Sequence, residues 1–556
     1  MTDTIVARQR VAEPATEQEL FLEVRGLNVG FERADGVRSV VRDVSFELRR
    51  GQCLALVGES GSGKSVTART LVGLTGENAV VEADELRLDE HDLLGTSDRD
   101  WRRIRGRRVG FILQDALVSL DPLRPVGAEI EEALALHGWG KAADRGRKSI
   151  DLLDSVGVPN PAQRARQRPD ELSGGLRQRA LIASALALDP ELIIADEPTT
   201  ALDVTVQAQV LDLLTDTKAR GVSIILISHD LSVVAHLADH IAVMRGGEIV
   251  ESGPAAGVLH RPQHEYTKQL IAAIPGEHSR GTRLSGGAAR VVPALPRVER
   301  DGTEPVLEAT GLVKRFPTPA GGIHTAVSGV SFALRRGTTL GIVGESGSGK
   351  STTARIALAL ETAEAGEVRL LGQDWSGVPE RRRRALRRKI SVVYQDPLSS
   401  FDPRWRVERI LSDALPARFP KKKRAARIRE LIEQVGLPVE VVGRFPLTLS
   451  GGQRQRVAIA RALATEPEII VFDEAVSALD VSVQAQILDL LVDLRDQLGL
   501  SYMFISHDLG VISHLSDEVL VMKDGEVVEH GDVDQIFNRP QHPYTAELVG
   551  ALATID

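Results

Sequence analysis

The sequence predicts an α/β protein made of two tandem homologous domains, each built on a mostly parallel sheet. Long strings recur in the same order: GESGSGKS stands at 58–65 and again at 344–351, and ADEPTTALDVTVQAQ at 195–209 returns as FDEAVSALDVSVQAQ at 472–486. Apolar runs such as LIIAD and IIVFD alternate with helical segments such as VQAQVLDLLTDTKARG. This alternation predicts parallel sheets whose ligand sites lie at the carboxyl ends of the strands.

The repeat register sets the expected domain boundaries. We expect a flexible N-terminus at 1–19, a first domain at 20–275, a flexible linker at 276–305 and a second domain at 306–556. The linker is rich in Gly, Pro, Ser and Arg and has no regular apolar period. Two further motif pairs, ISHDLSV with ISHDLGV and RPQHEYT with RPQHPYT, keep the same order in both domains. The chain is therefore a tandem duplication and not a solenoid of short repeats.

The tetrad LSGG occurs at 172–175, 449–452 and 284–287. The first two copies keep the repeat register and are followed by the triplet RQR, whereas the third lies in the expected linker, in TRLSGGAAR. We therefore expect two functional copies and one coincidence. Replacement of Ser285, in the third copy, is expected to leave the activity unchanged.

Composition narrows the functional class. The net charge of −9 disfavours a general nucleic-acid-binding protein. The single cysteine, Cys53, excludes a disulfide framework, a Cys₄ zinc site and a Cys₄ iron–sulfur cluster. The sequence shows neither a bilayer-spanning apolar run nor a secretion signal, so we expect a cytoplasmic protein. Basic runs at 102–108, 381–389 and 421–424 suggest either RNA contact or, as we favour, a solvated helix face or a face near anionic lipid headgroups.

GESGSGKS fits the phosphate-loop pattern G-x-x-x-x-G-K-[ST] and follows an apolar strand in both domains. Its glycines let backbone N–H groups face phosphate oxygens, and the helix that follows adds the positive end of its dipole. We expect Lys64 and Lys350 to neutralise the β- and γ-phosphates, and Ser65 and Ser351 to ligate Mg²⁺. The predicted nucleotide-binding residues here are Gly58, Ser60, Gly61, Ser62, Gly63, Lys64, Ser65 and Val66, with Gly344, Ser346, Gly347, Ser348, Gly349, Lys350, Ser351 and Thr352.

An Asp-Glu pair closes one apolar strand in each domain, and a histidine in the triplet S-H-D ends the next. The aspartate can hold the Mg²⁺ shell, and the glutamate can polarise an attacking water as a general base. Both domains repeat the order Lys, Gln, LSGG, Asp-Glu, His, which favours one catalytic constellation in each. The predicted residues are Asp196, Glu197 and His229, with Asp473, Glu474 and His507.

This order of motifs resembles the nucleotide-binding domain of ATP-binding cassette (ABC) proteins over almost the full length of both halves. The resemblance implies two P-loop ATPase domains, each with a β subdomain and a helical subdomain. The two domains are expected to face each other head to tail, with two ATPs and Mg²⁺ bound between them. The resemblance also implies that LSGG is a signature capping the ATP of the opposite domain, and that the Q-loop glutamines join the Mg²⁺ shell. For the two aromatic residues, packing in the core is an open alternative to stacking on adenine. The residues so implied are Gln114 and Gln395 in the Q-loops, Ser173, Gly174, Gly175, Ser450, Gly451, Gly452 and Gln453 in the signatures, Asp203 and Asp480 in the D-loops, and Phe31 and Phe316 at adenine.

One implied ATP site pairs Lys64 and Glu197 with 449–453, and the other pairs Lys350 and Glu474 with 172–176, so the chain is an internal pseudo-heterodimer. Because each half keeps its glutamate and histidine, we expect both sites to hydrolyse ATP. The first signature ends in Leu176 where the second has Gln453, a difference expected to tune one site.

RPQHEYT and RPQHPYT, with the helical segments after them, resemble the C-terminal extension of dipeptide, oligopeptide and nickel importer ATPases. The resemblance implies a membrane-peripheral module on the cytoplasmic face of the inner membrane. Its implied partners are two transmembrane permease subunits and an extracytoplasmic substrate-binding protein. Short peptides are the favoured cargo; nickel, glutathione and peptide-like siderophores or antibiotics are alternatives. A tandem ABC ATPase acting on ribosomes is disfavoured, because that type has a long, charged, helical linker.

Overall fold

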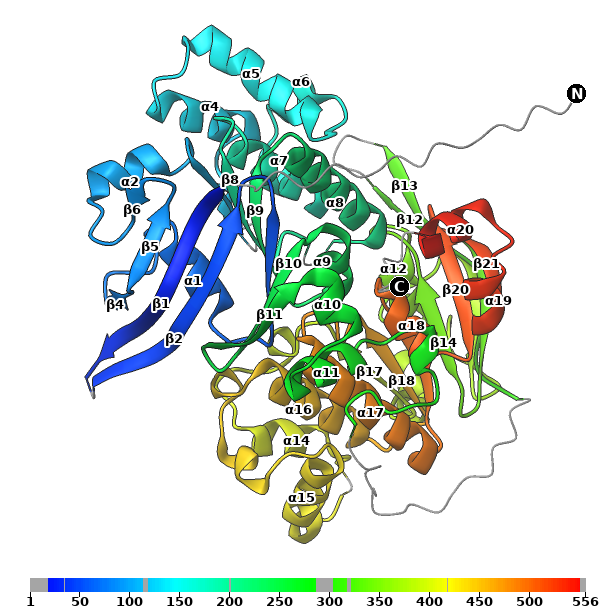
Figure 1. The fold of residues 1–556 in the computed structure, drawn as a ribbon. Helices are drawn as coiled ribbons and strands as arrows, with labels where there is room; N and C mark the ends of the chain where they lie inside the picture. Colours follow the sequence, from blue (N-terminus) through cyan, green and yellow to red (C-terminus); the bar gives the residue numbers. More distant parts are fainter. Residues whose placement is uncertain are drawn as a thin grey trace, which may run out of the picture.

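The computed structural model places two similar halves side by side, the first coloured blue to green and the second yellow-green to red (Figure 1). No helix among the residues it describes has the length and apolar character to cross a membrane. The expected flexible N-terminus lies outside the described residues, except at its last position. The described residues are 19–34, 36–113, 119–199, 202–286, 304–317, 322–417 and 419–550.

The first half contains a six-stranded sheet in the order β11-β10-β3-β9-β8-β7, parallel except for the β10–β11 hairpin. Its central strands are buried at every position, as expected for parallel strands covered on both faces. These strands are β3 (Cys53–Val57), β7 (Val109–Ile112), β8 (Leu192–Asp196), β9 (Ser223–Ser228), β10 (His240–Arg245) and β11 (Glu248–Pro254).

An antiparallel sheet packs against the six-stranded sheet of this half, in the order β2-β1-β5-β6, with β4 paired to β1. Apolar residues of the two sheets pack together with helix α1 in one core. The antiparallel strands are β1 (Leu20–Arg33), β2 (Gly36–Arg49), β4 (Ala79–Glu82), β5 (Glu85–Leu88) and β6 (His91–Asp92).

The helices of the first half follow the same strand–helix alternation. They are α1 (Lys64–Thr70), α2 (Asp98–Ile104), α4 (Val126–Leu136), α5 (Ala142–Ser155), α6 (Pro161–Arg164), α7 (Gly174–Ala185), α8 (Val204–Ala219), α9 (Leu231–Leu237), α10 (Ala255–His260) and α11 (Glu265–Ala272), with 3₁₀ turns η1 (Pro169–Glu171) and η2 (Glu277–Ser279). Helices α4, α5 and α7 pack together as a helical subdomain.

The second half repeats this architecture. Its six-stranded sheet has the order β17-β18-β19-β14-β20-β21, and its antiparallel sheet the order β13-β12-β15-β16. The strands are β12 (Pro305–Pro317), β13 (Ile323–Arg335), β14 (Thr339–Val343), β15 (Ala365–Leu370), β16 (Gln373–Asp374), β17 (Ile390–Tyr394), β18 (Ile469–Asp473), β19 (Ser501–Ile505), β20 (Glu518–Lys523) and β21 (Glu526–Asp532). The helices are α12 (Lys350–Ala357), α13 (Glu380–Arg387), α14 (Val407–Ala414), α15 (Arg424–Gln434), α16 (Gly451–Leu463), α17 (Val481–Leu498), α18 (Leu509–Leu515), α19 (Val533–Asn538) and α20 (Pro543–Gly550), with η3 (Leu398–Ser400), η4 (Lys421–Lys423), η5 (Val439–Gly443) and η6 (Pro446–Thr448).

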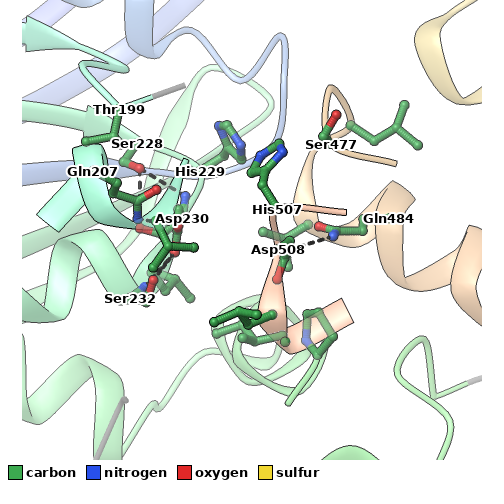
Figure 2. Close-up of a pocket in the computed structure, with 18 of the residues that line it drawn as sticks. Thr199, Gln207, Ser228, His229, Asp230, Ser232, Ser477, Gln484, His507 and Asp508 are labelled. Carbon is green, nitrogen blue, oxygen red and sulfur yellow. Dashed lines mark hydrogen bonds between the residues drawn. The ribbon is translucent and has the colours of Figure 1, made fainter. Parts of the chain in front are cut away.

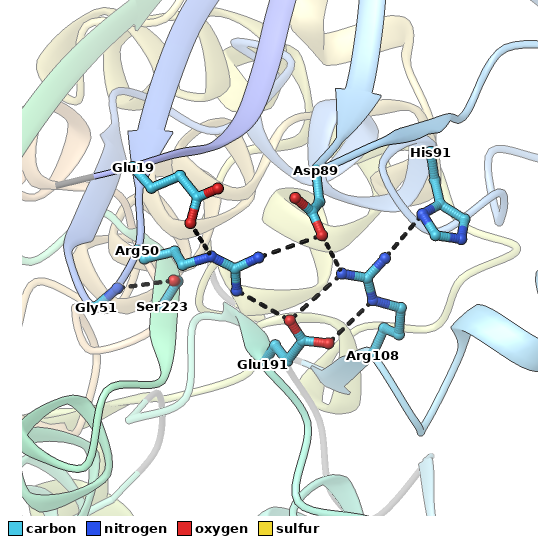
Figure 3. A network of polar contacts seen from close by, with 8 residues as sticks. All are labelled: Glu19, Arg50, Gly51, Asp89, His91, Arg108, Glu191 and Ser223. Carbon is cyan, nitrogen blue, oxygen red and sulfur yellow. Dashed lines mark hydrogen bonds and ion pairs between the residues drawn. The ribbon is translucent and has the colours of Figure 1, made fainter.

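A network of ion pairs joins the two sheets of the first half at the amino ends of β7 and β8 (Figure 3). Arg108 binds Asp89 at 2.9 Å and Glu191 at 3.0 Å. Arg50 contacts the same two carboxylates at 3.2 and 3.0 Å. The predicted site lies at the carboxyl ends of the parallel strands, whereas this network lies at their amino ends. The network therefore holds the two sheets together without entering the predicted site.

The interpretation of the basic runs as solvated helix faces is wrong for several arginines. Arg105 donates hydrogen bonds to the carbonyls of Val72 and Gly73, both at 2.7 Å, and Arg108 belongs to the ion-pair network. In the second run, the guanidinium of Arg387 lies 4.8 Å from the centre of the buried Trp375 ring. These cations are used inside the fold, and sequence composition does not distinguish them from surface charge.

The start of the expected flexible linker is ordered against the second half, which corrects that prediction for residues 276–286. Arg283 binds both carboxylate oxygens of Asp493, at 2.9 and 3.2 Å. The backbone N–H groups of Leu284 and Ser285 donate to Asp489 at 3.1 and 3.0 Å, and the Ser285 hydroxyl also donates to Asp489. Two buried carboxylates on α17 need such donors, because burying an unpaired charge is costly. Residues 287–303 of the linker lie outside the described residues.

Candidate active sites

Each phosphate loop lies between a central strand and the helix that follows, β3 to α1 and β14 to α12. Gly58 has φ 145°, and a Cβ there would lie 2.1 Å from the carbonyl oxygen of Met244. Gly344 has φ 146° and meets Met522 at the same distance. The loop backbone passes directly against the neighbouring strand of the sheet, β10 in the first half and β20 in the second. Only glycine therefore fits at the first position of both loops.

The loop lysines are buried and face their own loop carbonyls. Lys64 Nζ donates to the carbonyls of Gly58 and Glu59 at 2.7 and 2.8 Å, and Lys350 Nζ to those of Gly344 and Glu345, both at 2.7 Å. Burial lowers the pKa of both lysines, and the nearby carboxylates oppose that shift. A buried cation at a strand end is suited to hold phosphate oxygens.

A serine and an aspartate meet beside each lysine. Ser65 Oγ donates to Asp196 Oδ1 at 3.0 Å, and Ser351 Oγ to Asp473 Oδ1 at 3.0 Å. Burial raises the pKa of both aspartates, and the serine hydrogen bond opposes the shift. Within the described residues, no group of three or more His, Cys, Asp or Glu side chains could hold a metal ion. One hydroxyl and one carboxylate oxygen fit an Mg²⁺ ion that takes its other ligands from phosphates and water.

The glutamate that follows each aspartate contacts the predicted histidine. Glu197 and Glu474 both have φ 52°, a left-handed conformation that turns the chain sharply after the strand. Glu197 Oε1 lies 3.2 Å from His229 Nδ1, and Glu474 Oε2 lies 3.7 Å from His507 Nδ1. Burial lowers the pKa of each histidine, but the bond to its glutamate and the glutamate's charge outweigh it, so both values are raised.

The two signature serines cap helices. Ser450 Oγ accepts from the N–H of Gln453 at 3.3 Å, and the Gln453 side chain accepts from the N–H of Ser450 at 3.2 Å, which is a capping box. In the first half, Ser173 Oγ accepts from the N–H of Leu176 at 3.5 Å, and Leu176 packs on the core. The single-letter difference between the signatures therefore changes the cap of one helix.

The structure brings the first signature and the second phosphate loop into one pocket across the two halves. The Ser346 N–H donates to Asp203 Oδ2 at 3.2 Å, and Thr205 Oγ1 donates to Glu345 Oε1 at 3.0 Å. The pocket is lined by Ser173, Gly174, Gly175, Asp203, Glu345 and Ser346, among others. At the other loop, the charge of Asp480 acts on Lys64 from the opposite half. The predicted D-loop aspartates thus approach the opposite phosphate loops.

The two histidines line one pocket between the halves, together with Asp230, Asp508, Gln207 and Gln484 (Figure 2). Gln484 Nε2 donates to Asp508 Oδ2 at 3.1 Å, and Gln207 Nε2 lies 3.5 Å from Asp230 Oδ2. The loops after β9 and β19 therefore face each other across the interface.

The other predicted site residues lie at the following places in the structure. Gln395 lies in a pocket with Ser351, Asp473 and Glu474, and its Nε2 donates to Ser477 Oγ at 3.3 Å. Gln114 lies outside the described residues. Ser60, Gly61, Ser346 and Gly347 are exposed loop positions, Ser62 and Ser348 are buried near the lysines, Gly63 and Gly349 are left-handed caps of α1 and α12, and Val66, Thr352, Gly451 and Gly452 are partly buried.

The two aromatic residues proposed for adenine lie near the free ends of long hairpins in the antiparallel sheets. Phe316 is 36% exposed, so it is not a core residue, and Lys314 lies 5.1 Å from its ring centre. Phe31 is partly buried between β2 and β4. Their contact with adenine stays a prediction.

Sequence reasoning missed two functional candidates, Tyr266 and Tyr544. The N–H of Glu59 donates to the Tyr266 hydroxyl and the N–H of Glu345 to the Tyr544 hydroxyl, both at 3.1 Å. The repeated strings RPQHEYT and RPQHPYT were a signal for them. Those strings pointed to a family resemblance but not to a contact with the phosphate loop, because Glu59 and Glu345 lie about 200 positions earlier in the chain.

Two phosphate loops, each with an Asp-Glu-His set and each met by the other half, define a tandem P-loop nucleotide-binding ATPase. The sequence model of the ABC transporter family matches residues 41–200 and 327–477. That of the oligopeptide/dipeptide transporter C-terminal region matches residues 250–294 and 528–556. The chain belongs to the ABC transporter family and carries two of its ATP-binding ATPase domains.

Two curated relatives match this chain over almost its whole length. The oligopeptide transport ATP-binding protein OppD of Mycobacterium tuberculosis is 42% identical over 96% of this chain and 98% of that protein. The glutathione import ATP-binding protein GsiA of Escherichia coli K12 is 42% identical over 96% of this chain and 89% of that protein. A solved dimeric ATP-binding cassette with ADP and phosphate is 24% identical to this chain, covers 42% of it and 98% of its own chain, and has a TM-score of 0.39.

Proposed function

We propose that this chain is the ATP-hydrolysing energy module of a membrane ABC importer for short peptides, with two ATPs bound between its halves. The observation that carries the proposal is the pocket shared by the first signature and the second phosphate loop. There the D-loop aspartate of one half accepts a hydrogen bond from the loop backbone of the other. Such a site is complete only when the halves are together, so ATP binding favours their association.

At each site the chain supplies positive charge, oriented donors and a base. Lys64 and Lys350 bind phosphate oxygens, and the signature helices α7 and α16 present their N-terminal N–H groups to the ATP of the opposite half. Glu197 and Glu474 orient and deprotonate the attacking water, and His229 and His507 hold those glutamates. Ser65 with Asp196, and Ser351 with Asp473 and Gln395, would hold Mg²⁺, which when bound would neutralise charge on the phosphates.

The peptide cargo rests on the relatives and on the C-terminal region repeated in both halves. The names of relatives that match 96% of this chain refer to oligopeptide transport and to import of glutathione, itself a short peptide. An importer of this kind needs two transmembrane permease subunits and an extracytoplasmic substrate-binding protein, so the chain works at the cytoplasmic face of the membrane.

Purification of the tagged chain from membranes tests the proposal. We expect two polytopic membrane proteins to co-purify, and the reconstituted complex to hydrolyse ATP faster when a peptide-loaded binding protein is added. Parallel assays with dipeptide, oligopeptide, glutathione and nickel identify the cargo. Stimulation by nickel alone would contradict the peptide assignment, and co-sedimentation with ribosomes in place of permeases would contradict import.

A further inference from the structure

Two tyrosines of the C-terminal regions reach the phosphate loops in the same way. Tyr266 lies at the start of α11 and Tyr544 at the start of α20, and each is 4% exposed. Each hydroxyl accepts a hydrogen bond from the loop residue that follows the first glycine, Glu59 or Glu345, at 3.1 Å. The two halves repeat the contact together with the strings that carry it, GESGSGKS in the loops and RPQHEYT or RPQHPYT around the tyrosines.

The motif around each tyrosine is built to place it. His264 Nδ1 accepts from the N–H of Tyr266 at 3.1 Å and so caps α11. Glu251, on β11, accepts from the N–H groups of Gln263 and His264 at 2.8 and 3.0 Å. Arg245 lies 4.8 Å from the centre of the Tyr266 ring. The Tyr266 ring is thus positioned by the capped start of α11, by Glu251 on β11 and by the Arg245 cation.

The second half holds Tyr544 with equivalent groups. His542 Nδ1 accepts from the N–H of Tyr544 at 3.2 Å, and Glu529 accepts from the N–H groups of Gln541 and His542 at 2.9 and 3.0 Å. Lys523 lies 4.4 Å from the ring centre. Lysine replaces the arginine of the first half, but the cation keeps its place.

The contacted amide belongs to the peptide group whose carbonyl faces the loop lysine. The N–H of Glu345 donates to Tyr544, while the carbonyl of Gly344, in the same peptide group, accepts from Lys350 Nζ at 2.7 Å. A peptide group is planar and its N–H and C=O point in opposite directions. Holding the N–H on the tyrosine therefore keeps the carbonyl toward the lysine. Glu59, Gly58 and Lys64 repeat this arrangement in the first half.

The tyrosine also stands next to the contact from the opposite half. The next loop residue, Ser346, donates to Asp203, so consecutive amides are held by the C-terminal region of one half and the D-loop of the other. Burial raises the pKa of Tyr544 to about 12, so its hydroxyl stays protonated at neutral pH.

We propose that Tyr266 and Tyr544 are positioning residues of the two ATP sites, each orienting the first peptide group of its phosphate loop toward the loop lysine. ATP affinity then depends on the C-terminal region, which is outside the residues matched by the ABC transporter model. This inference rests on the proposed role of both loops in binding ATP.

Tyr266→Phe, Tyr544→Phe and the double variant test it in the full chain. Loss of one neutral hydrogen bond per site is expected to weaken binding of trinitrophenyl-labelled ATP, and to raise the KM for ATP, about three- to tenfold, with kcat within about twofold of wild type. Each single variant weakens one of two binding phases and the double variant weakens both.

Tyr502→Phe is the matched control, because the Tyr502 hydroxyl donates to the carbonyl of Leu491 at 3.0 Å within the core of the second half. It is expected to lower thermal stability and leave the KM unchanged. Unchanged affinity in the double variant, a fall in kcat at constant KM, or an equal KM shift in the control would overturn the positioning role alone. Failure of the wild-type chain to bind the labelled ATP would overturn the ATP sites themselves.

Discussion

Removing the guanidinium of Arg283 is expected to destabilise the second half of the chain without changing ATP hydrolysis per folded molecule. Two N–H groups of Arg283 bind the carboxylate of Asp493, whose side chain is 8% exposed. Breaking a fully buried ion pair by removing one partner costs about 3–5 kcal/mol. Because the Arg283 side chain is 29% exposed, solvent screens part of the interaction, and we expect a loss of about 2 kcal/mol.

Differential scanning calorimetry of the full chain measures this loss. For a domain of this size, the unfolding transition of the second half is expected to fall by roughly 4–8 °C. Asp493→Ala is expected to act in the same direction. Asp216→Ala is the matched control, because Asp216 occupies the equivalent position on α8 and is exposed. Equal transitions in all three variants, or lost ATPase activity at an unchanged transition, would refute the reasoning.

Ser285→Ala completes the test of the third LSGG copy. Its hydroxyl and backbone N–H both bind Asp489, so the variant loses one of several donors and about 1–2 kcal/mol. ATP hydrolysis is expected to stay unchanged, whereas Ser450→Ala, which removes the cap of a signature helix, is expected to reduce it. Reduced hydrolysis in the Ser285 variant at wild-type stability would show that the third copy is functional.

Three further predictions follow from the site geometry. Glu197→Gln and Glu474→Gln, made separately, are expected to reduce ATP hydrolysis by about 100-fold or more at the altered site, and unimpaired turnover in either would show that its site is dispensable. Glu474→Gln is also expected to lower the pKa of His507 below its ordinary value, measured by NMR titration, because burial then acts without the glutamate. In the unaltered chain, stabilisation by this pair is full below the ordinary histidine pKa and is lost as pH rises through the raised one. Gly452→Ala places a Cβ about 2.4 Å from Val483 Cγ1, and this clash is expected to lower the free energy of unfolding by about 1–3 kcal/mol and to reduce ATP hydrolysis. Adding Val483→Ala is expected to restore stability and hydrolysis. A double variant that stays impaired would contradict the steric explanation.

Much of each site was predictable because its chemistry is local. The glycines, lysine and serine of a phosphate loop act from eight consecutive residues, and the tandem repeat identified the same string twice. The Asp-Glu pairs and histidines could be placed because parallel strands bring their carboxyl ends to one edge. In the structure, Ser65 lies beside Asp196 and Glu197 lies beside His229.

Composition failed where charge is used inside the fold. Residues 276–286 have the composition of a flexible linker, yet Leu284 is 3% exposed and Arg283 pairs with a buried carboxylate. The burial of Asp489 and Asp493 on α17 could not be predicted from residue type, because Asp212 and Asp216 occupy the equivalent positions on α8 and are exposed. Identical residue types on equivalent helices therefore have opposite environments, which depend on what packs over them.

The sequence alone determined that the chain has two phosphate loops, two LSGG signatures in the repeat register and an Asp-Glu pair in each half, because each of these motifs is a run of consecutive residues. Tertiary structure alone decided which distant groups meet. It placed Tyr266 against Glu59 and Ser285 against Asp489, the latter 204 residues apart. A hydrogen bond across such a separation forms only when packing brings donor and acceptor together, and no local pattern in the chain records it.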